Sequence, residues 1–236
     1  MNSNNLITQT QAEIKPTRIW RLVVAACLIV LIYRESILDW SKVGGDSMQP
    51  TLLSGDRVSV NKLAFGLRLP FFDHALWSWA LPSRGDVITF MSPDGQRTLV
   101  KRVIAVPGDE VRLKHHRLSI NGEPAHYLHL DGSDIANDFT LPPGQYLERS
   151  MDTIRSIQIS TVAPLPLNSH IELTMVPAGK LLVLGDHRNQ SWDFRKLGWI
   201  DQASVIGRAE RVLWSLNADS GLRNARWWLP LRPADS

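Results

Sequence analysis

Residues 84–109 read RGDVITFMSPDGQRTLVKRVIAVPGD and contain the pattern that decides the fold. Residues 86–90 alternate as a strand does when one face is buried, and residues 98–106 are β-branched and apolar. Pro93 and Gly95 separate the two stretches, and both residue types favour turns over continuous secondary structure. This part of the chain therefore predicts two β-strands with a turn between them.

The same pattern of short strands and turns continues over the rest of the chain after residue 40. Proline and glycine recur between the strands, no long amphipathic helix is expected there, and the sequence has no internal repeat. Such a series of short strands is typical of a mainly antiparallel β-protein. Further strands are predicted at residues 57–60, 118–121, 154–162, 171–175 and 181–184.

The composition fits one sizeable domain, or a domain with a smaller one inserted. The chain has 236 residues, of which 44% are hydrophobic and 21% are charged, so bulk disorder is not expected. The net charge of +3 is too small to suggest a nucleic-acid partner, although it suits an anionic membrane surface. Cys27 is the only cysteine, which rules out an intramolecular disulfide and a cysteine-based zinc site.

An apolar segment lies near the N-terminus, after a polar tail at residues 1–16. Residues 22–33 form an unbroken apolar run of twelve, whereas about 20 residues are needed to cross a bilayer. A cleaved secretory signal and a buried core helix would both contain a run of this length. We favour one transmembrane anchor over residues 17–40, because Arg18 and Arg21 precede the run and basic residues stay on the cytoplasmic side.

Tryptophan is unusually frequent, with nine residues against three tyrosines, and it favours membrane interfaces as well as cores. Trp20 and Trp40 would lie near the two interfaces of the predicted anchor. Residues 62–82 are rich in Phe, Trp and Leu, and they form either a core segment or an apolar surface that rests on lipid. Residues 223–232 are likewise either a core segment or an apolar surface that rests on lipid.

Four segments of the chain carry recognisable motifs, in this order: GDSMQPTL at 45–52, RGDVITF at 84–90, VKRVIAVPGD at 100–109, and GDHRNQSWDFR at 185–195, which is followed by Gly198. Their content, order and position after an N-terminal apolar segment closely resemble the signature boxes of bacterial type I signal peptidases, also called leader peptidases. The resemblance covers most of residues 40–215. The resemblance implies a membrane-bound serine endopeptidase that removes signal peptides from exported preproteins after A-x-A-like sites.

The resemblance assigns Ser47 as the nucleophile and Lys101 as the general base. A serine hydroxyl attacks poorly until a base takes its proton, and a lysine is a base only when neutral. The pKa of a lysine in water is ~10.4, so Lys101 must be buried among apolar groups to act near neutral pH. Its sequence neighbours at 99–100 and 103–104 are apolar, as this requires.

The resemblance also implies supporting residues. The Ser191 hydroxyl would hold the amine of Lys101, and Asp193 and Arg195 would stiffen that loop as a carboxylate–guanidinium pair, unless they form a plain surface ion pair. The backbone N–H of Ser47 would stabilise the oxyanion. Some relatives add a serine hydroxyl two residues before the nucleophile, where this chain has Gly45, so a backbone group or water would have to replace it.

Small apolar pockets would select the methyl side chains of an A-x-A site. We expect Val43, Met48, Leu52 and Val100 to line them, because these residues lie near the two catalytic residues in the sequence. The alternative for all four is ordinary core packing.

The resemblance implies the following organisation: a cytoplasmic tail at 1–16, the anchor at 17–40, a catalytic β core at 41–112 and 176–216, an inserted β region at 113–175, and a C-terminal tail at 217–236. The protein would lie in the bacterial inner membrane with its catalytic domain outside the cytoplasm. Its partners would be signal peptides of preproteins and membrane lipid. No nucleic acid, cofactor or metal is expected.

Several other functions remain open to test. None of the seven histidines lies in a recognisable hydrolase pattern, and no carboxylate partners have a spacing that would complete a metal site with His126 and His129. Self-cleaving repressors share a Ser/Lys mechanism but need a DNA-binding module. The closest alternative among peptidases is one dedicated to pilin or conjugation precursors. The alternative without enzymatic activity is a catalytically dead, membrane-tethered β scaffold that binds exported polypeptides.

Overall fold

A computed structural model of the chain describes residues 19–26, 38–67, 77–130, 141–160, 170–217 and 221–231. Residues 19–26 are helical, whereas the remaining residues of the predicted anchor up to residue 37 lie outside the described part. Within these ranges, no helix has both the length and the apolar character needed to cross a membrane. The first strand, β1 (Leu38–Lys42), begins before the anchor boundary predicted at residue 40.

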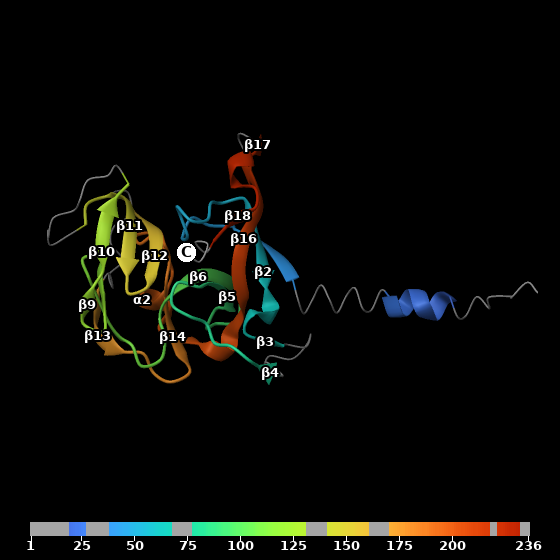
Figure 1. Ribbon diagram of the computed structural model, residues 1–236, viewed down its shortest axis with the longest axis horizontal. Coiled ribbons are helices and arrows are strands. Elements are labelled where there is room, and N and C mark those ends of the chain that lie inside the picture. Colours follow the sequence, from blue (N-terminus) through green and yellow to red (C-terminus); the bar gives the residue numbers. More distant parts are fainter. Residues whose placement is uncertain are drawn as a thin grey trace, which may run out of the picture.

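The larger unit is an antiparallel sheet whose strand order is β1-β2-β16-β5-β6-β14-β15 (Figure 1). The long strand β16 pairs with β2 on one side and β5 on the other, and it also pairs with two short C-terminal strands. The members after β1 are β2 (Asp56–Asn61), β5 (Val87–Met91), β6 (Thr98–Ala105), β14 (Lys180–Leu184), β15 (Ile200–Asp201), β16 (Val205–Asn217), β17 (Gly221–Leu222) and β18 (Leu229–Pro230).

The smaller unit contains two sheets and stands to one side of the larger sheet (Figure 1). One sheet has the order β13-β7-β8-β9, and the other has the order β10-β11-β12. Their strands are β7 (Glu110–Lys114), β8 (Arg117–Ile120), β9 (Glu123–Pro124), β10 (His126–His129), β11 (Gly144–Ser150), β12 (Thr153–Ile159) and β13 (Ile171–Met175). The inserted region thus begins at β7, slightly before the predicted boundary.

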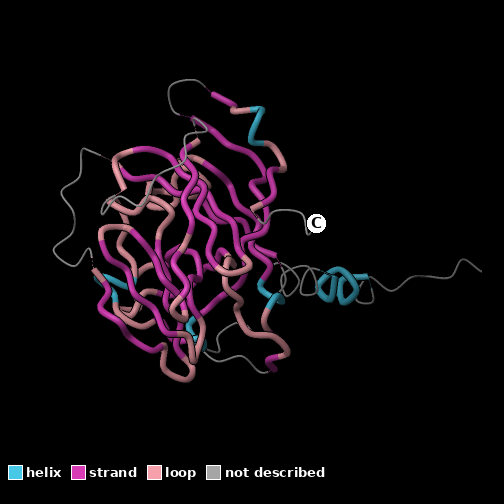
Figure 2. Tube along the Cα trace, turned by 60° about the vertical axis from the view of Figure 1, so that its left-hand side comes forward, coloured by secondary structure: helices cyan, strands magenta, loops and turns pink. Residues whose placement is uncertain are grey.

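Helices are few and short in the described part after residue 38 (Figure 2). Besides the α-helix α2 (Phe194–Leu197), these are the 3-10 helices η1 (Lys62–Ala64), η2 (Gln202–Ser204) and η3 (Asn224–Arg226). The two-residue strands β3 (Gly66–Leu67) and β4 (Trp77–Ser78) pair with each other after η1. The mainly antiparallel β fold expected from the sequence is therefore confirmed.

Every strand predicted from the sequence is present, but the longest strand, β16, was not predicted. Its pairing with β2 shifts register twice, between Ala209 and Arg211 and between Val212 and Trp214. Each shift breaks the two-residue alternation on which the prediction depends. The C-terminal residues expected to be a tail are also partly strand, because β17 and β18 pair with β16.

One apolar cluster of the core lies directly below the turn that carries Ser47. It joins residues of that turn, Met48 and Leu52, to Val58 of β2 and Val212 of β16. A second cluster is formed by buried side chains of the neighbouring strands β5, β6, β14 and β15. A third is shared by the smaller unit and by β6 and β14, so the two units have a continuous interior.

Candidate active site

Ser47 lies in a tight turn between β1 and β2. The backbone N–H of Leu52 donates to the Met48 carbonyl at 2.9 Å, and that of Gln49 donates to the Asp46 carbonyl at 3.1 Å. Met48 and Leu52 are buried below the turn, with 1% and 0% exposure, which anchors it to the sheet. Ser47 itself stays half-buried at the top of the turn, where a substrate can reach it.

Lys101 approaches this serine from β6. Its Nζ lies 2.8 Å from Ser47 Oγ and donates a second hydrogen bond to the Val100 carbonyl at 2.9 Å. The side chain is only 3% exposed, because β5 pairs with β6 along this stretch and the Ser47 turn covers it. Burial lowers the pKa of Lys101 from 10.5 to about 8, although Asp193 and Asp186 work in the opposite direction. A substantial fraction of this lysine is therefore neutral near physiological pH.

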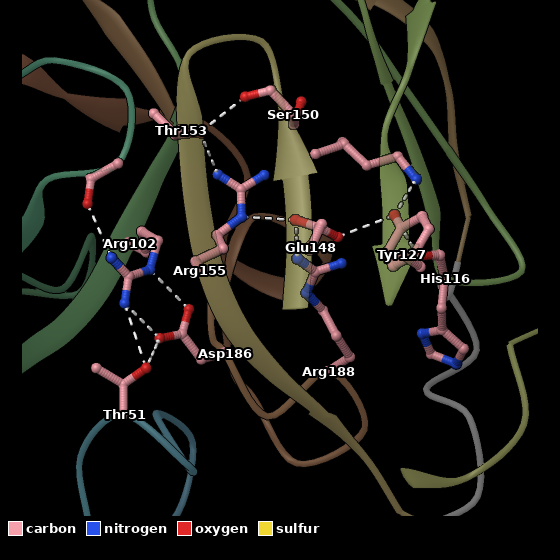
Figure 3. Close-up of polar contacts among 12 residues, drawn as sticks. Thr51, Arg102, His116, Tyr127, Glu148, Ser150, Thr153, Arg155, Asp186 and Arg188 are labelled. Carbon is pink, nitrogen blue, oxygen red and sulfur yellow. Dashed lines mark hydrogen bonds and ion pairs between the residues drawn. The ribbon is translucent and has the colours of Figure 1, made fainter. Parts of the chain in front are cut away.

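Arg102, the next residue, points to the other side of β6 and binds a buried carboxylate (Figure 3). Its guanidinium makes two hydrogen bonds to Asp186, at 2.9 and 2.6 Å, and one to the Gly85 carbonyl at 2.9 Å. Thr51 donates its hydroxyl to the same carboxylate at 2.5 Å. The Ser47 turn, β6 and the loop after β14 are thereby held together.

Asp193 fixes the loop that faces the serine. It accepts a hydrogen bond from the Gly185 backbone N–H at 3.0 Å and caps α2 by accepting from the Arg195 N–H. The Arg195 guanidinium binds it at 2.8 and 2.7 Å, and both side chains are fully buried. Burial alone would raise the pKa of Asp193, but the bonds to Arg195 hold it below its ordinary value. The alternative of a plain surface ion pair is therefore wrong.

Ser191 lies in the same loop, beside the serine turn. A methyl group added at Gly185 would collide with Ser191 Oγ at 2.2 Å and with the Ser47 carbonyl oxygen at 2.4 Å, so both groups flank this glycine. Ser191 Oγ makes no hydrogen bond of good geometry in the described part, although it is near enough to lower the pKa of Asp193. The two hydrogen bonds of Lys101 Nζ described above go to other groups, so the expected Ser191 contact remains a prediction.

The smaller unit supports this loop through β12. The Gln158 N–H donates to the Asp186 carbonyl, and the Arg188 N–H donates to the Gln158 carbonyl, both at 2.9 Å. The Arg188 and Arg155 side chains both bind Glu148, at 2.7 and 2.6 Å (Figure 3). Burial alone would raise the pKa of Glu148, but these two cations lower it to about 2. The carboxylate thus stays charged and links the inserted region to the loop.

The surroundings of the expected oxyanion donor are open. Gly45 is exposed, and a Cβ placed there would meet no atom within 4 Å. His187 also contacts the turn, since its N–H donates to the Ser47 carbonyl at 3.1 Å and its Nδ1 lies 3.2 Å from the Asp46 carbonyl. This histidine therefore lies in the loop after β14 and packs against the serine turn through its backbone and its ring.

The structure gathers the four expected pocket residues into one apolar cluster beside the serine. Val43 is buried, and Val100 packs against the cluster while remaining half-buried. Met48 and Leu52 lie deeper and belong to the core.

The comparisons with known proteins indicate one family. Residues 17–214 match the family described as signal peptidase, peptidase S26. The chain belongs to this family. It is a serine endopeptidase of the bacterial type I signal peptidase group, as its relatives indicate.

Two relatives illustrate the similarity within the signal peptidase family. The signal peptidase I of Pseudomonas fluorescens is 31% identical over 202 residues, which span 79% of this chain and 68% of that protein. The signal peptidase IB of Staphylococcus aureus (strain Mu50) is 30% identical over 199 residues, which span 83% of this chain and 88% of that protein. A solved signal peptidase I from Enterococcus faecalis has 29% identity and a TM-score of 0.33, with 56% of this chain and 98% of that chain covered.

Arg102, Asp186 and Thr51 lie inside the signal peptidase boxes, but the sequence did not predict a role for them. Arg102 directly follows Lys101 in a buried strand, and neighbouring side chains of a strand point to opposite faces of the sheet. A charged side chain buried on that opposite face needs a carboxylate partner, and this was the signal by which the sequence could have predicted the ion pair. That this carboxylate is Asp186 depends on how β6 and β14 pair, and their register places Arg102 opposite Leu184, two residues before it.

Proposed function

We propose that this chain cleaves N-terminal signal peptides from exported preproteins after A-x-A-like sites, with Ser47 as nucleophile and Lys101 as general base. The observation that carries the proposal is the 2.8 Å contact between Lys101 Nζ and Ser47 Oγ, with the lysine almost fully buried. A buried amine with a pKa of about 8 has the proton affinity that a general base needs near neutral pH.

The chemistry follows from these two groups. Neutral Lys101 takes the hydroxyl proton as Ser47 Oγ attacks the scissile carbonyl carbon, which forms a tetrahedral oxyanion. The resulting ammonium passes its proton to the leaving amine as the peptide bond breaks, and an acyl-enzyme remains. Water then attacks the ester and gives a proton to Lys101, after which Ser47 leaves with a proton and the signal peptide is released. The base thus ends each cycle neutral.

The oxyanion would be stabilised first by the backbone N–H of Ser47. The second donor is a water molecule or a backbone group, because Gly45 offers no hydroxyl and leaves open space on that side. Ser191, beside the serine turn, would orient the Lys101 amine when substrate covers the site. The buried Asp193–Arg195 pair would hold Ser191 in place.

The substrate would bind as an extended strand along β6. In the described ranges, the pairing of β14 with β6 begins at Arg102, so residues 98–101 have a strand partner only on the β5 side. Such a free edge offers backbone hydrogen bonds to a peptide. In an extended peptide the two alanines of an A-x-A site point to one face. That face would meet the half-buried Val100, with the buried Val43, Met48 and Leu52 of the same apolar cluster beneath it.

We also propose that the protein is anchored in the bacterial inner membrane, with its N-terminus in the cytoplasm and its catalytic domain outside. The basic residues before the apolar run support this orientation. Lipid contact by the domain is supported by Trp77, Trp79 and Leu81, which are 71%, 58% and 61% exposed. These residues follow η1, which contacts β1, the strand on which the chain enters the domain from the anchor.

The deciding experiment is cleavage of a model preprotein by the purified full chain in detergent and by its Ser47→Ala, Lys101→Ala and double variants. Because the two residues act as one unit, all three variants should fall to the same very low rate. Turnover by Lys101→Ala close to that of the parent would refute the Ser/Lys mechanism. Absence of cleavage by a folded parent would favour a membrane-tethered scaffold instead.

A further inference from the structure

Trp192 is an exposed aromatic residue placed between two buried residues of the active-site loop. Its exposure is 58%, whereas Ser191 and Asp193 are 4% and 0% exposed. Asp193 is fixed by Arg195 and by the Gly185 N–H, so the backbone on the C-terminal side of Trp192 has little freedom. An indole held rigidly on the surface loses little conformational entropy on binding a ligand.

Two cations from different segments hold this indole in position. Lys196 Nζ, on α2, lies 4.8 Å from the ring centroid, and Arg97 Cζ, in the turn before β6, lies 5.9 Å from it. Both distances are within the range of a cation–π contact. The ring therefore links the active-site loop to the beginning of β6, and we call these three residues the Trp192 clamp.

The Trp192 clamp lies at the end of the free edge of β6. Arg97 directly precedes residues 98–101, which have no second strand partner in the described part of the chain. The distance along a strand from Arg97 to Lys101 is about 13 Å at ~3.3 Å per residue. A peptide bound along this edge would thus reach the clamp three or four residues away from the scissile bond.

The charge of the clamp determines which side chain it favours. Arg97 and Lys196 are both exposed, and neither forms an ion pair with a residue that the structure describes. The nearest buried acid in sequence, Asp193, is already bound by Arg195. Asp94 attracts Arg97 without forming an ion pair with it. A substrate carboxylate would therefore meet two cations that are not bound to a carboxylate, whereas a basic side chain would meet repulsion.

We infer that the Trp192 clamp is a substrate subsite, which binds an acidic side chain three or four residues from the scissile bond. The inference rests on the proposed peptidase function. The clamp orients the substrate without touching the reacting atoms, so it should affect KM more than kcat.

The test compares soluble peptides that keep the A-x-A site and differ only by Asp or Lys at the fourth residue before the scissile bond, or at the third or fourth residue after it. At one of these positions the full chain should cleave the Asp peptide about five-fold more efficiently than the Lys peptide, mainly through KM, since each exposed ion pair contributes only a modest preference. Lys196→Glu should abolish the preference, because the clamp then carries no net charge, and Trp192→Ala should reduce it to about two-fold or less.

Trp228→Ala is the matched control, because Trp228 is also 58% exposed and has Arg211 5.6 Å from its ring. It should leave the preference unchanged. Because Lys196 is exposed, Lys196→Glu gives a readout even if Trp192→Ala unfolds in a thermal melt. Equal cleavage of both peptides by the parent at all three positions, or the same loss in Trp228→Ala, would overturn the inference while the peptidase function stands. No cleavage of any peptide or preprotein would reject the proposed function itself.

Discussion

Replacing Lys101 by methionine should make the protein inactive and, near neutral pH, more stable. The folded environment lowers the pKa of this lysine from 10.5 to about 8, mainly through burial. At about 1.4 kcal/mol per pH unit, keeping it protonated in the folded state costs about 3 kcal/mol. Lys101→Met removes this cost together with the hydrogen bonds to Ser47 Oγ and to the Val100 carbonyl. The half-buried Ser47 hydroxyl can bond water instead, whereas the Val100 carbonyl loses its partner, which costs about 1 kcal/mol. The net gain is about 2 kcal/mol, or about 6 °C in Tm for a chain of this size.

The stability that Lys101→Met gains over the parent should fall as the pH rises. Between pH 8 and 10.5 the unfolded chain carries a proton on Lys101 that the folded chain has lost, so the stability of the parent rises with pH. Below pH 8 both states are protonated and the full cost is present. Above pH 10.5 both are neutral, the cost disappears, and only the lost hydrogen bond remains. Lys101→Met should therefore be more stable than the parent at pH 6 and less stable at pH 10.5.

The assay is urea and thermal unfolding of the full chain in detergent at several pH values from 6 to 10.5. Ser47→Ala is the control, because it is also inactive but keeps the lysine, and its stability should follow the pH dependence of the parent. In the parent, kcat/KM should rise with pH around a midpoint near 8, where Lys101 loses its proton. A stability difference that is the same at pH 6 and pH 10.5 would refute the argument that burial lowers the pKa of this lysine.

Three further predictions concern the surroundings of the dyad. Asp193→Ala removes the carboxylate that the buried Arg195 guanidinium binds, so it should cost about 3–5 kcal/mol in chemical denaturation, whereas a cost below 1 kcal/mol would mean that the pair does not stiffen the loop. Gly45→Ser should fold normally, since the added atoms meet open space, and its new hydroxyl should raise kcat with little change in Tm; an unchanged or lower kcat would show that this position does not face the oxyanion. Replacing Trp77 and Trp79 by serine should weaken vesicle binding by a form without residues 1–37, while cleavage of a soluble peptide stays within two-fold; a large loss of Tm would instead identify them as core.

The sequence by itself determined most of the β-strands and indicated the two residues of the proposed dyad. Strands such as β5 and β13 were predictable because alternation and turn residues are local signals. Ser47 and Lys101 could be chosen because their motifs lie in a recognisable order along the chain. The strand β16 was not predictable, because its two register shifts are set by β2 beside it, and Gly207 is required there by the close approach of Asn61.

Only the tertiary structure decided which charged residue of β6 lies beside Ser47 and which one forms a buried ion pair. Lys101 and Arg102 are adjacent in sequence, yet one is buried without a bound carboxylate beside Ser47 and the other is bound to Asp186 on the opposite face. The local pattern tells which side chains share a face of β6, but not what covers each face. Desolvation depends on every segment packed around a group, and these segments come from positions 47, 186 and 193, far apart in the chain. The lowered pKa on which the proposed mechanism depends is therefore a property of the folded chain and not of the strand that carries Lys101.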